Sequence, residues 1–345
     1  NLSADKNIVN VLLSLGFFPI ILAGPIQRPA TLLPQIRSMR RFEYAQVTDG
    51  LRQILWGLFV KIAVADNLAP FADEIFSDFS GKPGSTLLAG ALFYSIQIYA
   101  DFSGYSHIAI GTARILGFRL IQNFNYPYFS RDITEFWKRW HISLTTWFRD
   151  YLFLPVSFSI SWKIKREKIV FIKTDLFIYI IASLLTWFLT GLWHGANYTF
   201  LVWGLLHGLL MIFYHWQKKP RKRFLKMVNL SNNNMVLSFA EGIFTFIFIT
   251  LTWVIFRVDS MRSAISYLGG IFSHSLFSSP GDMPIREISI AILFIIIEFF
   301  RKEKPHPLQF DMPNRIWIRW SIYTVLILII LFFGGGSQKF IYFQF

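Results

Sequence analysis

Two histidines lie in an otherwise apolar stretch of the chain, GLWHGANYTFLVWGLLHG at residues 191–208, and are candidates for proton-transfer chemistry there. Between Leu176 and Gln217 there is no Lys, Arg, Asp or Glu. An ionisable side chain in such a run is a candidate functional residue, and an imidazole, whose unperturbed pKa is about 6.5, can act as a base near neutral pH. From position alone, His194 is either this base or a histidine that meets water at a helical bend.

The other chemically active side chains give weaker signals. His207 and His215 are about two helical turns apart and share a face, but no carboxylate is nearby, so we predict no metal site. His141 stands in a charged and aromatic segment, where a structural hydrogen bond is the simpler interpretation. The chain has no cysteine, no Gly-x-Ser-x-Gly nucleophile turn and no phosphate-binding glycine-rich loop. These absences exclude a cysteine nucleophile, a serine-hydrolase turn and a nucleotide-binding loop.

The composition is that of a membrane protein. Hydrophobic residues make up 54% of the chain and charged residues 16%, compared with about 25% charged residues in soluble domains. The net charge of +14 comes largely from basic clusters between the apolar runs, at 163–168, 218–223 and 301–304. Because the cytoplasmic loops of membrane proteins are enriched in Lys and Arg, we interpret this charge as topology and not as a nucleic-acid-binding surface.

We therefore expect an all-α polytopic membrane protein that forms a single domain over residues 1–345. The runs of about 20 apolar residues that suit a membrane span lie at 8–23, 84–100, 176–191, 196–216, 236–257 and 320–336, with weaker candidates at 51–65, 102–118 and 287–300. The chain begins with Asn1 and not with Met. We expect that N-terminal helices of the complete protein are missing from it.

The uncharged run 176–217 is long enough for two spans, and basic clusters flank it on both sides. It predicts a hairpin with both ends in the cytoplasm and a bend near residues 192–196, with His194 on the bend. Gly191 and Gly195 are expected to loosen the helix there and let a substrate approach closely. The runs 236–257 and 287–300 predict a second pair of spans, joined by a non-cytoplasmic connection at 259–282.

Residues 131–153, RDITEFWKRWHISLTTWFRDYLF, alternate charges with aromatic side chains. This pattern predicts an amphipathic helix that lies in the membrane interface or folds into the protein, with a start near Thr134 and Glu135. Its Lys and Arg side chains suit phosphate groups or an acidic protein. Anchoring to anionic lipid is the commoner role of such residues, and both interpretations stay open.

Several motifs together resemble the membrane-bound O-acyltransferase (MBOAT) family, in particular its branch of bacterial alginate O-acetyltransferase membrane subunits. They are AGPIQRPATLLPQI (23–36), DFSGYSHIAIGTARILGF (101–118), NYPYFSRDITEFWKRWHISLTTWFRDYLFLP (125–155), GLWHGANYTFLVWGLLHG (191–208) and FIYFQF (340–345). By these motifs, GLWHG places the family's catalytic histidine at His194, and FWKRWH places its second histidine at His141. The resemblance covers nearly the whole chain.

The resemblance implies an enzyme that moves an acyl group, by preference acetyl, from a cytoplasmic thioester to a hydroxyl of an extracytoplasmic polysaccharide or partner protein. No bound cofactor is expected, because the donor, acetyl-CoA or an acyl carrier protein, is a cosubstrate. On the outer side the expected partner is a secreted SGNH-type acyltransferase or exported polysaccharide. The lipid bilayer surrounds the protein, no nucleic acid is involved, and the expected location is the bacterial inner membrane with several spans.

Five further residues are predicted to contact substrate. Asn197 follows His194 by three residues and is expected on the same helical face, where its amide would orient the imidazole or bind an oxyanion. Trp193 and Trp140 would wall the site and exclude water, although both also suit a packing role. Arg139 and Asp150 supply charge within the amphipathic segment.

Two features of the sequence depart from the family pattern. His107 stands where the family usually has an acid, and VSFSISWK follows YLFLP where many relatives have a glycine pair. Two other functions remain open. The resemblance also includes relatives that carry out D-alanyl transfer from a carrier protein to a cell-wall polymer. The residues themselves leave open a non-catalytic acyl or lipid transporter, with Glu241 and Glu298 as candidates for an ion pathway.

Overall fold

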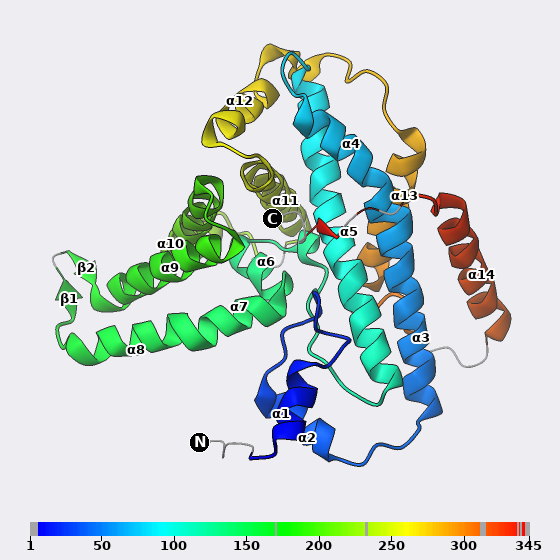
Figure 1. The fold of residues 1–345 in the computed structure, drawn as a ribbon. Coiled ribbons are helices and arrows are strands. Elements are labelled where there is room, and N and C mark those ends of the chain that lie inside the picture. The colour runs from blue at the N-terminus through cyan, green and yellow to red at the C-terminus, as the bar shows by residue number, and fades with distance from the viewer. Residues whose placement is uncertain are drawn as a thin grey trace. The chain divides into compact units, whose positions relative to one another are not determined.

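The computed structural model describes residues 6–169, 171–231, 234–310, 315–336, 338 and 340–341, and it is almost entirely helical (Figure 1). The sheet in this described part is one short antiparallel hairpin of β1 (Lys168–Ile169) and β2 (Ile172–Lys173). The predicted all-α class is confirmed. Of the FIYFQF motif, residues 342–345 lie outside the described residues.

The chain divides into two compact units. The first comprises residues 1–74, 93–125 and 282–344, and the second comprises 75–92 and 126–281. The prediction of a single domain therefore stays a prediction. All seven residues predicted for the site belong to the second unit.

The first unit is built on a long helix that includes a π-helical segment. Its elements are α1 (Ile8–Leu15), α2 (Pro29–Arg37), α3 (Tyr44–Leu58), a π-helix (Phe59–Ala65), α13 (Ile285–Arg301) and α14 (Ile316–Phe333), together with most of α4 (Asp66–Ser77) and α5 (Gly84–Ile115). A Cβ at Gly57 of α3 would collide with the backbone of Gly104 of α5. Close approach at small residues is a common way for membrane helices to pack.

The second unit contains the predicted site. Its elements are a 3₁₀ turn (Pro127–Phe129), α6 (Ile133–Arg139), α7 (Ile142–Phe148), a π-helical turn (Arg149–Phe153), α8 (Leu154–Lys163), β1, β2, α9 (Thr174–His194), α10 (Tyr198–Met227), α11 (Met235–Arg257), α12 (Met261–Ile271) and a second 3₁₀ turn (His274–Phe277). Figure 1 shows α9 and α10 running side by side, with α8 along α9.

Five helices in the described part are long and apolar enough to cross a membrane. They are the continuous helix Tyr44–Ser77 and the helices α9, α10, α11 and α14. Many of their large apolar side chains are exposed; Leu331 and Phe332 of α14 are each 70% exposed. Apolar surface of this extent suits lipid and not water, which supports the predicted polytopic membrane protein.

Three of the predicted runs are corrected by the structure. The run 8–23 is not a spanning helix, because α1 ends at Leu15 and Gly16 caps it, with turns following around Pro19. The runs 84–100 and 102–118 are not separate spans. They form one continuous helix of 32 residues, α5, which includes Asp101 between them. A charged side chain that is buried and paired, as Asp101 is with Lys61, does not interrupt a helix.

The predicted hairpin of 176–217 is present. α9 ends at His194 and α10 begins at Tyr198, so the bend falls where the sequence predicts it. Gly191 has a different role from the expected one, because a Cβ there would collide with the carbonyl oxygen of Phe200 in α10. On α10, a Cβ at Gly204 would collide with the carbonyl oxygen of Trp187. Gly191 therefore lets the two helix backbones touch and does not open space for a substrate.

The predicted amphipathic helix over 131–153 is in fact broken. It consists of α6, α7 and a π-helical turn, with Trp140 and His141 between α6 and α7. His141 has φ 43° and ψ 52°, a left-handed conformation that ends one helix and turns the chain into the next. The helix also begins slightly earlier than expected, because α6 starts at Ile133 with Asp132, and not Thr134, as its N-cap.

We predict that Gly204→Ala destabilises the α9–α10 hairpin by about 1–3 kcal/mol, the usual cost of forcing atoms into a packed contact. Thermal unfolding of the detergent-purified protein measures the change. The matched control is Gly269→Ala in the exposed part of α12, where a Cβ meets nothing within 4 Å. That variant should gain about 0.5–1 kcal/mol from lower backbone entropy. Equal melting temperatures for the two variants would contradict the packing argument.

Candidate functional site

His194 is the last residue of α9 and lies at the break before α10. The next residue, Gly195, has φ 151°, which side-chain-bearing residues rarely adopt, and a Cβ there would lie 2.9 Å from the ring of Phe200. The His194 side chain is half-buried. Its position at a glycine-dependent helix end, and not inside the helix, leaves the imidazole partly accessible.

Aromatic rings surround His194 on several sides. The ring centroids of Trp193, Phe256, Trp203 and Phe200 lie 4.9, 5.0, 5.4 and 6.3 Å from that of His194. Trp193 is 50% exposed, whereas Trp203 is almost fully buried. The surroundings of His194 are thus largely aromatic, with one exposed indole, and electrostatic interactions are stronger in such apolar surroundings than in water.

His141 lies near His194, and both rings lie near Trp193. The ring centroids of His141 and Trp193 are 6.4 Å apart. Burial, with a smaller contribution from the nearby His194, lowers the pKa of His141 to about 3. At physiological pH the His141 imidazole is therefore neutral and can both donate and accept a hydrogen bond. The structure brings together the two histidines that the family motifs single out.

Hydrogen bonds at the start of α6 hold this segment in place. The Asp132 carboxylate accepts from the backbone N–H of Glu135 at 2.9 Å, and the Glu135 carboxylate accepts from the backbone N–H of Arg131 at 2.8 Å. This is a reciprocal capping arrangement. The Tyr214 hydroxyl of α10 donates to Asp132 at 2.6 Å. Because α6 is tied to α10 at one end, the break at His141 has a defined position.

The charged residues of this region form ion pairs within the protein. Glu241 of α11 binds Arg131 at 2.8 Å and also pairs with Arg221 of α10. Glu298, in the first unit, is buried and accepts a hydrogen bond from Tyr99 at 2.8 Å. Both glutamates that motivated an ion pathway have fixed protein partners, which explains them as structural residues.

Asn197, one of the predicted substrate contacts, lies at the start of α10. Asn197 does not share a helical face with His194, because the helix ends at His194 and Asn197 caps α10. Its side chain accepts from the backbone N–H of Thr199 at 3.1 Å and donates to the carbonyl of Asp259 at 2.9 Å. The prediction that Asn197 orients the His194 imidazole from a shared helical face is therefore wrong. Its contact with substrate stays a prediction.

The other three predicted contacts divide between core and surface. Trp140 is buried and packs 5.0 Å from Trp253, as a core aromatic residue would. Arg139 pairs with Glu135 at 2.6 Å, and Asp150 pairs with the neighbouring Arg149 at 2.7 Å. Their substrate contacts stay predictions, and most of the positive charge of 131–153 is balanced within the segment and by Glu241.

Sequence reasoning missed one buried histidine of the second unit. His207 is 1% exposed, and the indole N–H of Trp137 donates to its Nδ1 at 3.2 Å. His215, predicted to share its face, is instead exposed and stacks on Tyr179 with 4.1 Å between centroids. Their spacing gave both histidines the same prediction. The structure distinguishes them, because Trp137 of α6 donates a hydrogen bond to His207.

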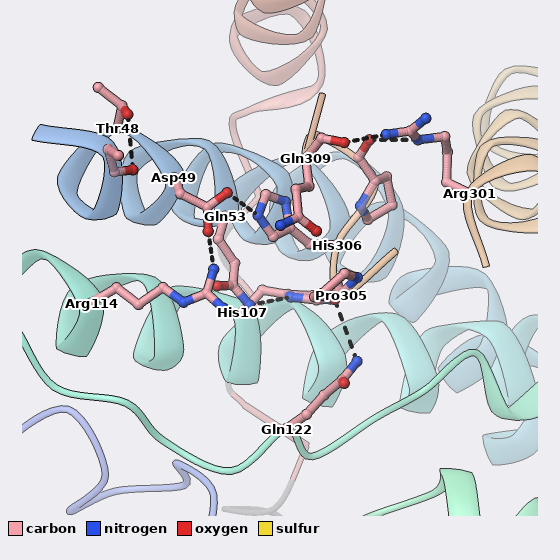
Figure 2. A network of polar contacts seen from close by, with 12 residues as sticks. Thr48, Asp49, Gln53, His107, Arg114, Gln122, Arg301, Pro305, His306 and Gln309 are labelled. Carbon is pink, nitrogen blue, oxygen red and sulfur yellow. Dashed lines mark hydrogen bonds and ion pairs between the residues drawn. The ribbon is translucent and has the colours of Figure 1, made fainter. Parts of the chain in front are cut away.

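In the first unit, a polar network surrounds His107, the residue that replaces the family's usual acid (Figure 2). The Nδ1 of His107 lies 3.2 Å from the side-chain nitrogen of Gln53. Nearby, Asp49 faces both Arg114 and His306, and the His306 Nε2 lies 3.0 Å from its carboxylate. The His306 side chain is fully buried. The carboxylate in this cluster is thus supplied by α3.

Comparison with known proteins decides the family. The profile of the membrane-bound O-acyltransferase family matches residues 2–256. The chain belongs to this family. The matched range includes His141, His194 and the aromatic residues around them, so the predicted family is confirmed over the part of the chain that forms the site.

Proteins similar to this chain have names that describe related reactions. The chain is 32% identical to a Pseudomonas putida protein named "Probable alginate O-acetylase AlgI", over 99% of the chain and 70% of the relative. It is 30% identical to a peptidoglycan O-acetyltransferase of Helicobacter pylori, over 96% of the chain and 64% of the relative. It is 31% identical to a teichoic acid D-alanyltransferase of Bacillus subtilis, over 60% of the chain and 52% of the relative.

The chain spans part of each of these MBOAT relatives. The share covered runs from 70% of the Pseudomonas putida protein to 50% of the Pseudomonas fluorescens protein with the same name. The predicted class, a membrane O-acyltransferase, agrees with the family and with all of these names.

The left-handed backbone of His141 gives a stability prediction that does not depend on its ring. A residue with a Cβ is disfavoured in this conformation by roughly 1–2 kcal/mol, whereas glycine is not. We expect His141→Gly to be more stable than His141→Ala by about 1 kcal/mol in thermal unfolding. At the exposed helical Ser266 of α12 the order should reverse, with Ala better than Gly by about 1 kcal/mol. The same order at both positions would contradict the strained conformation.

Proposed function

We propose that this chain forms the transfer site of a membrane enzyme that moves an acetyl group from a thioester to a hydroxyl of an extracytoplasmic polymer. The observation that carries the proposal is the placement of His194 and His141 around Trp193 at two helix breaks. Each break carries an imidazole near aromatic rings, half-buried at His194 and buried at His141. Membership of the MBOAT family and the O-acetylating relatives support the type of reaction.

In this mechanism His194 acts as the general base. Its imidazole takes the proton of the acceptor hydroxyl, and the oxygen attacks the carbonyl carbon of the thioester. The new C–O bond forms, the C–S bond breaks, and the thiolate leaves with the proton returned from the imidazolium. The neutral His141 is placed to hydrogen-bond the acceptor hydroxyl or the thioester. A positioned base of this kind contributes roughly 10²- to 10⁴-fold to the rate.

We further propose the direction and the partners of the reaction. The donor, acetyl-CoA or an acyl carrier protein, would approach from the cytoplasm, where the basic clusters of the sequence place the helix ends. No bound cofactor takes part. The acceptor, an exported polysaccharide or a secreted SGNH-type acyltransferase, would approach from outside the inner membrane that the several spans cross.

D-alanyl transfer to a cell-wall polymer is the second candidate, since two relatives are named teichoic acid D-alanyltransferases. The acetyl group is favoured because the alginate and Helicobacter relatives align with 80 to 99% of the chain, and the D-alanyl relatives with about 60%. Acetyl-CoA and a D-alanyl carrier protein, offered separately to the same vesicles, distinguish the two donors.

His194→Ala should abolish transfer while the protein still inserts into the membrane. We expect the release of free thiol from acetyl-CoA, measured with vesicles and alginate as acceptor, to fall at least about 10²-fold. His215→Ala is the matched control, because it removes an exposed histidine from the same helical hairpin. It should keep the wild-type rate.

Thiol release that persists in His194→Ala would refute the base assignment. Absence of thiol release from acetyl-CoA in the wild-type protein, together with movement of the acyl compound across the vesicle membrane, would instead favour a transporter.

A further inference from the structure

Beside His194, buried N–H groups of the second unit have no acceptor. Among the described residues, the indole nitrogens of Trp203 and Trp253 and the Nε2 of His207 have no hydrogen-bond partner. All three side chains are at most 2% exposed. Buried polar groups are nearly always paired, and each exception calls for an explanation.

The tautomer of His207 follows from its one contact. An indole nitrogen is only a donor, so the Nδ1 of His207 that faces the Trp137 N–H at 3.2 Å must be the acceptor. A neutral imidazole with Nδ1 unprotonated carries its proton on Nε2. The unpaired Nε2 of His207 is therefore an N–H donor, like the two indoles.

Ring contacts connect these donors to the catalytic histidine. The Trp203 ring lies at the centre, 5.4 Å from His194, 4.8 Å from His207 and 5.7 Å from Trp253, measured between centroids. The group offers donors and no acceptor, in an apolar surrounding where a hydrogen bond to a developing negative charge is strong. Such a set suits an oxygen that carries negative charge.

We propose that Trp203 and His207, with Trp253 stacked on Trp203, bind the carbonyl oxygen of the acyl thioester and stabilise the oxyanion that forms when the acceptor attacks. This inference rests on the proposed function and adds the electrophilic half of its site. Trp137 is a positioning residue, because its N–H selects the His207 tautomer that can donate. Donors of this kind act by being oriented before the charge develops.

Substitutions test the donors through kinetics. Trp203→Phe removes the N–H and keeps an aromatic ring, and we expect kcat to fall by about 10- to 1000-fold with a KM for acetyl-CoA close to that of the wild type. Trp56→Phe is the matched control, because Trp56 is a fully buried tryptophan of the first unit whose indole nitrogen also has no partner among the described residues. It should lower the melting temperature similarly and leave kcat unchanged.

His207 offers a rescue experiment. His207→Gln can place an amide N–H near the Nε2 position, whereas His207→Phe cannot, so the Gln variant should keep more of kcat than the Phe variant. Equal rates for the two His207 variants, or a kcat loss in Trp203→Phe no larger than in Trp56→Phe, would overturn the proposal.

A spectroscopic experiment separates this inference from the proposed function. Acetyl-CoA labelled with ¹³C at the carbonyl is bound to His194→Ala, which keeps the donors but lacks the base. We expect the C=O stretch to lie below its value in water, and to return toward that value in the double variant His194→Ala/Trp203→Phe. A bound thioester with an unshifted band in His194→Ala would overturn the oxyanion donors alone. No bound thioester at all would overturn the proposed function and this inference together.

Discussion

Backbone contact between α9 and α10 is the constraint on which the second unit depends. Gly191 and Gly204 allow each helix to touch the backbone of the other, and the short connection through Gly195 then leaves His194 at the helix end. A larger residue at either contact would separate the helices and change the position of every ring around His194. The position of His194 therefore depends on the two glycines, Gly191 and Gly204, at which the helices meet.

The α6–α7 segment completes the site by a different device. Its start is fixed by hydrogen bonds of Asp132 to Glu135 and Tyr214, and its middle is bent by the left-handed conformation of His141. Strained backbone of this kind costs roughly 1–3 kcal/mol and persists where the surroundings hold it. Here the surrounding packing of Trp140 and Phe136 against other rings holds it.

The aromatic residues of the second unit combine two functions that usually conflict. Trp137, Trp187, Trp203 and Trp253 bury a large apolar area, which stabilises the fold in a region with few ion pairs. Indole nitrogens that are buried are normally paired. Trp137 donates to His207, whereas the nitrogens of Trp203 and Trp253 have no partner among the described residues. An aromatic core that retains unpaired donors is less stable than one without them, and the role proposed for these donors is to bind a charged oxygen.

The local pattern of the sequence determined the membrane class, the hairpin at residues 176–217, the position of His194 on its bend and the MBOAT family, because apolar run length, charge placement and motifs are properties of neighbouring residues. The tertiary structure decided the rest. The Trp137–His207 bond joins residues 70 apart and the Asp49–His306 contact joins residues 257 apart, and no local pattern specifies such pairs. The break at His141 likewise depends on packing between helices, and it interrupts the single helix that the pattern of 131–153 predicted. Asn197 caps α10 and donates to Asp259, 62 residues away, so it does not share the helical face with His194 that their spacing predicted.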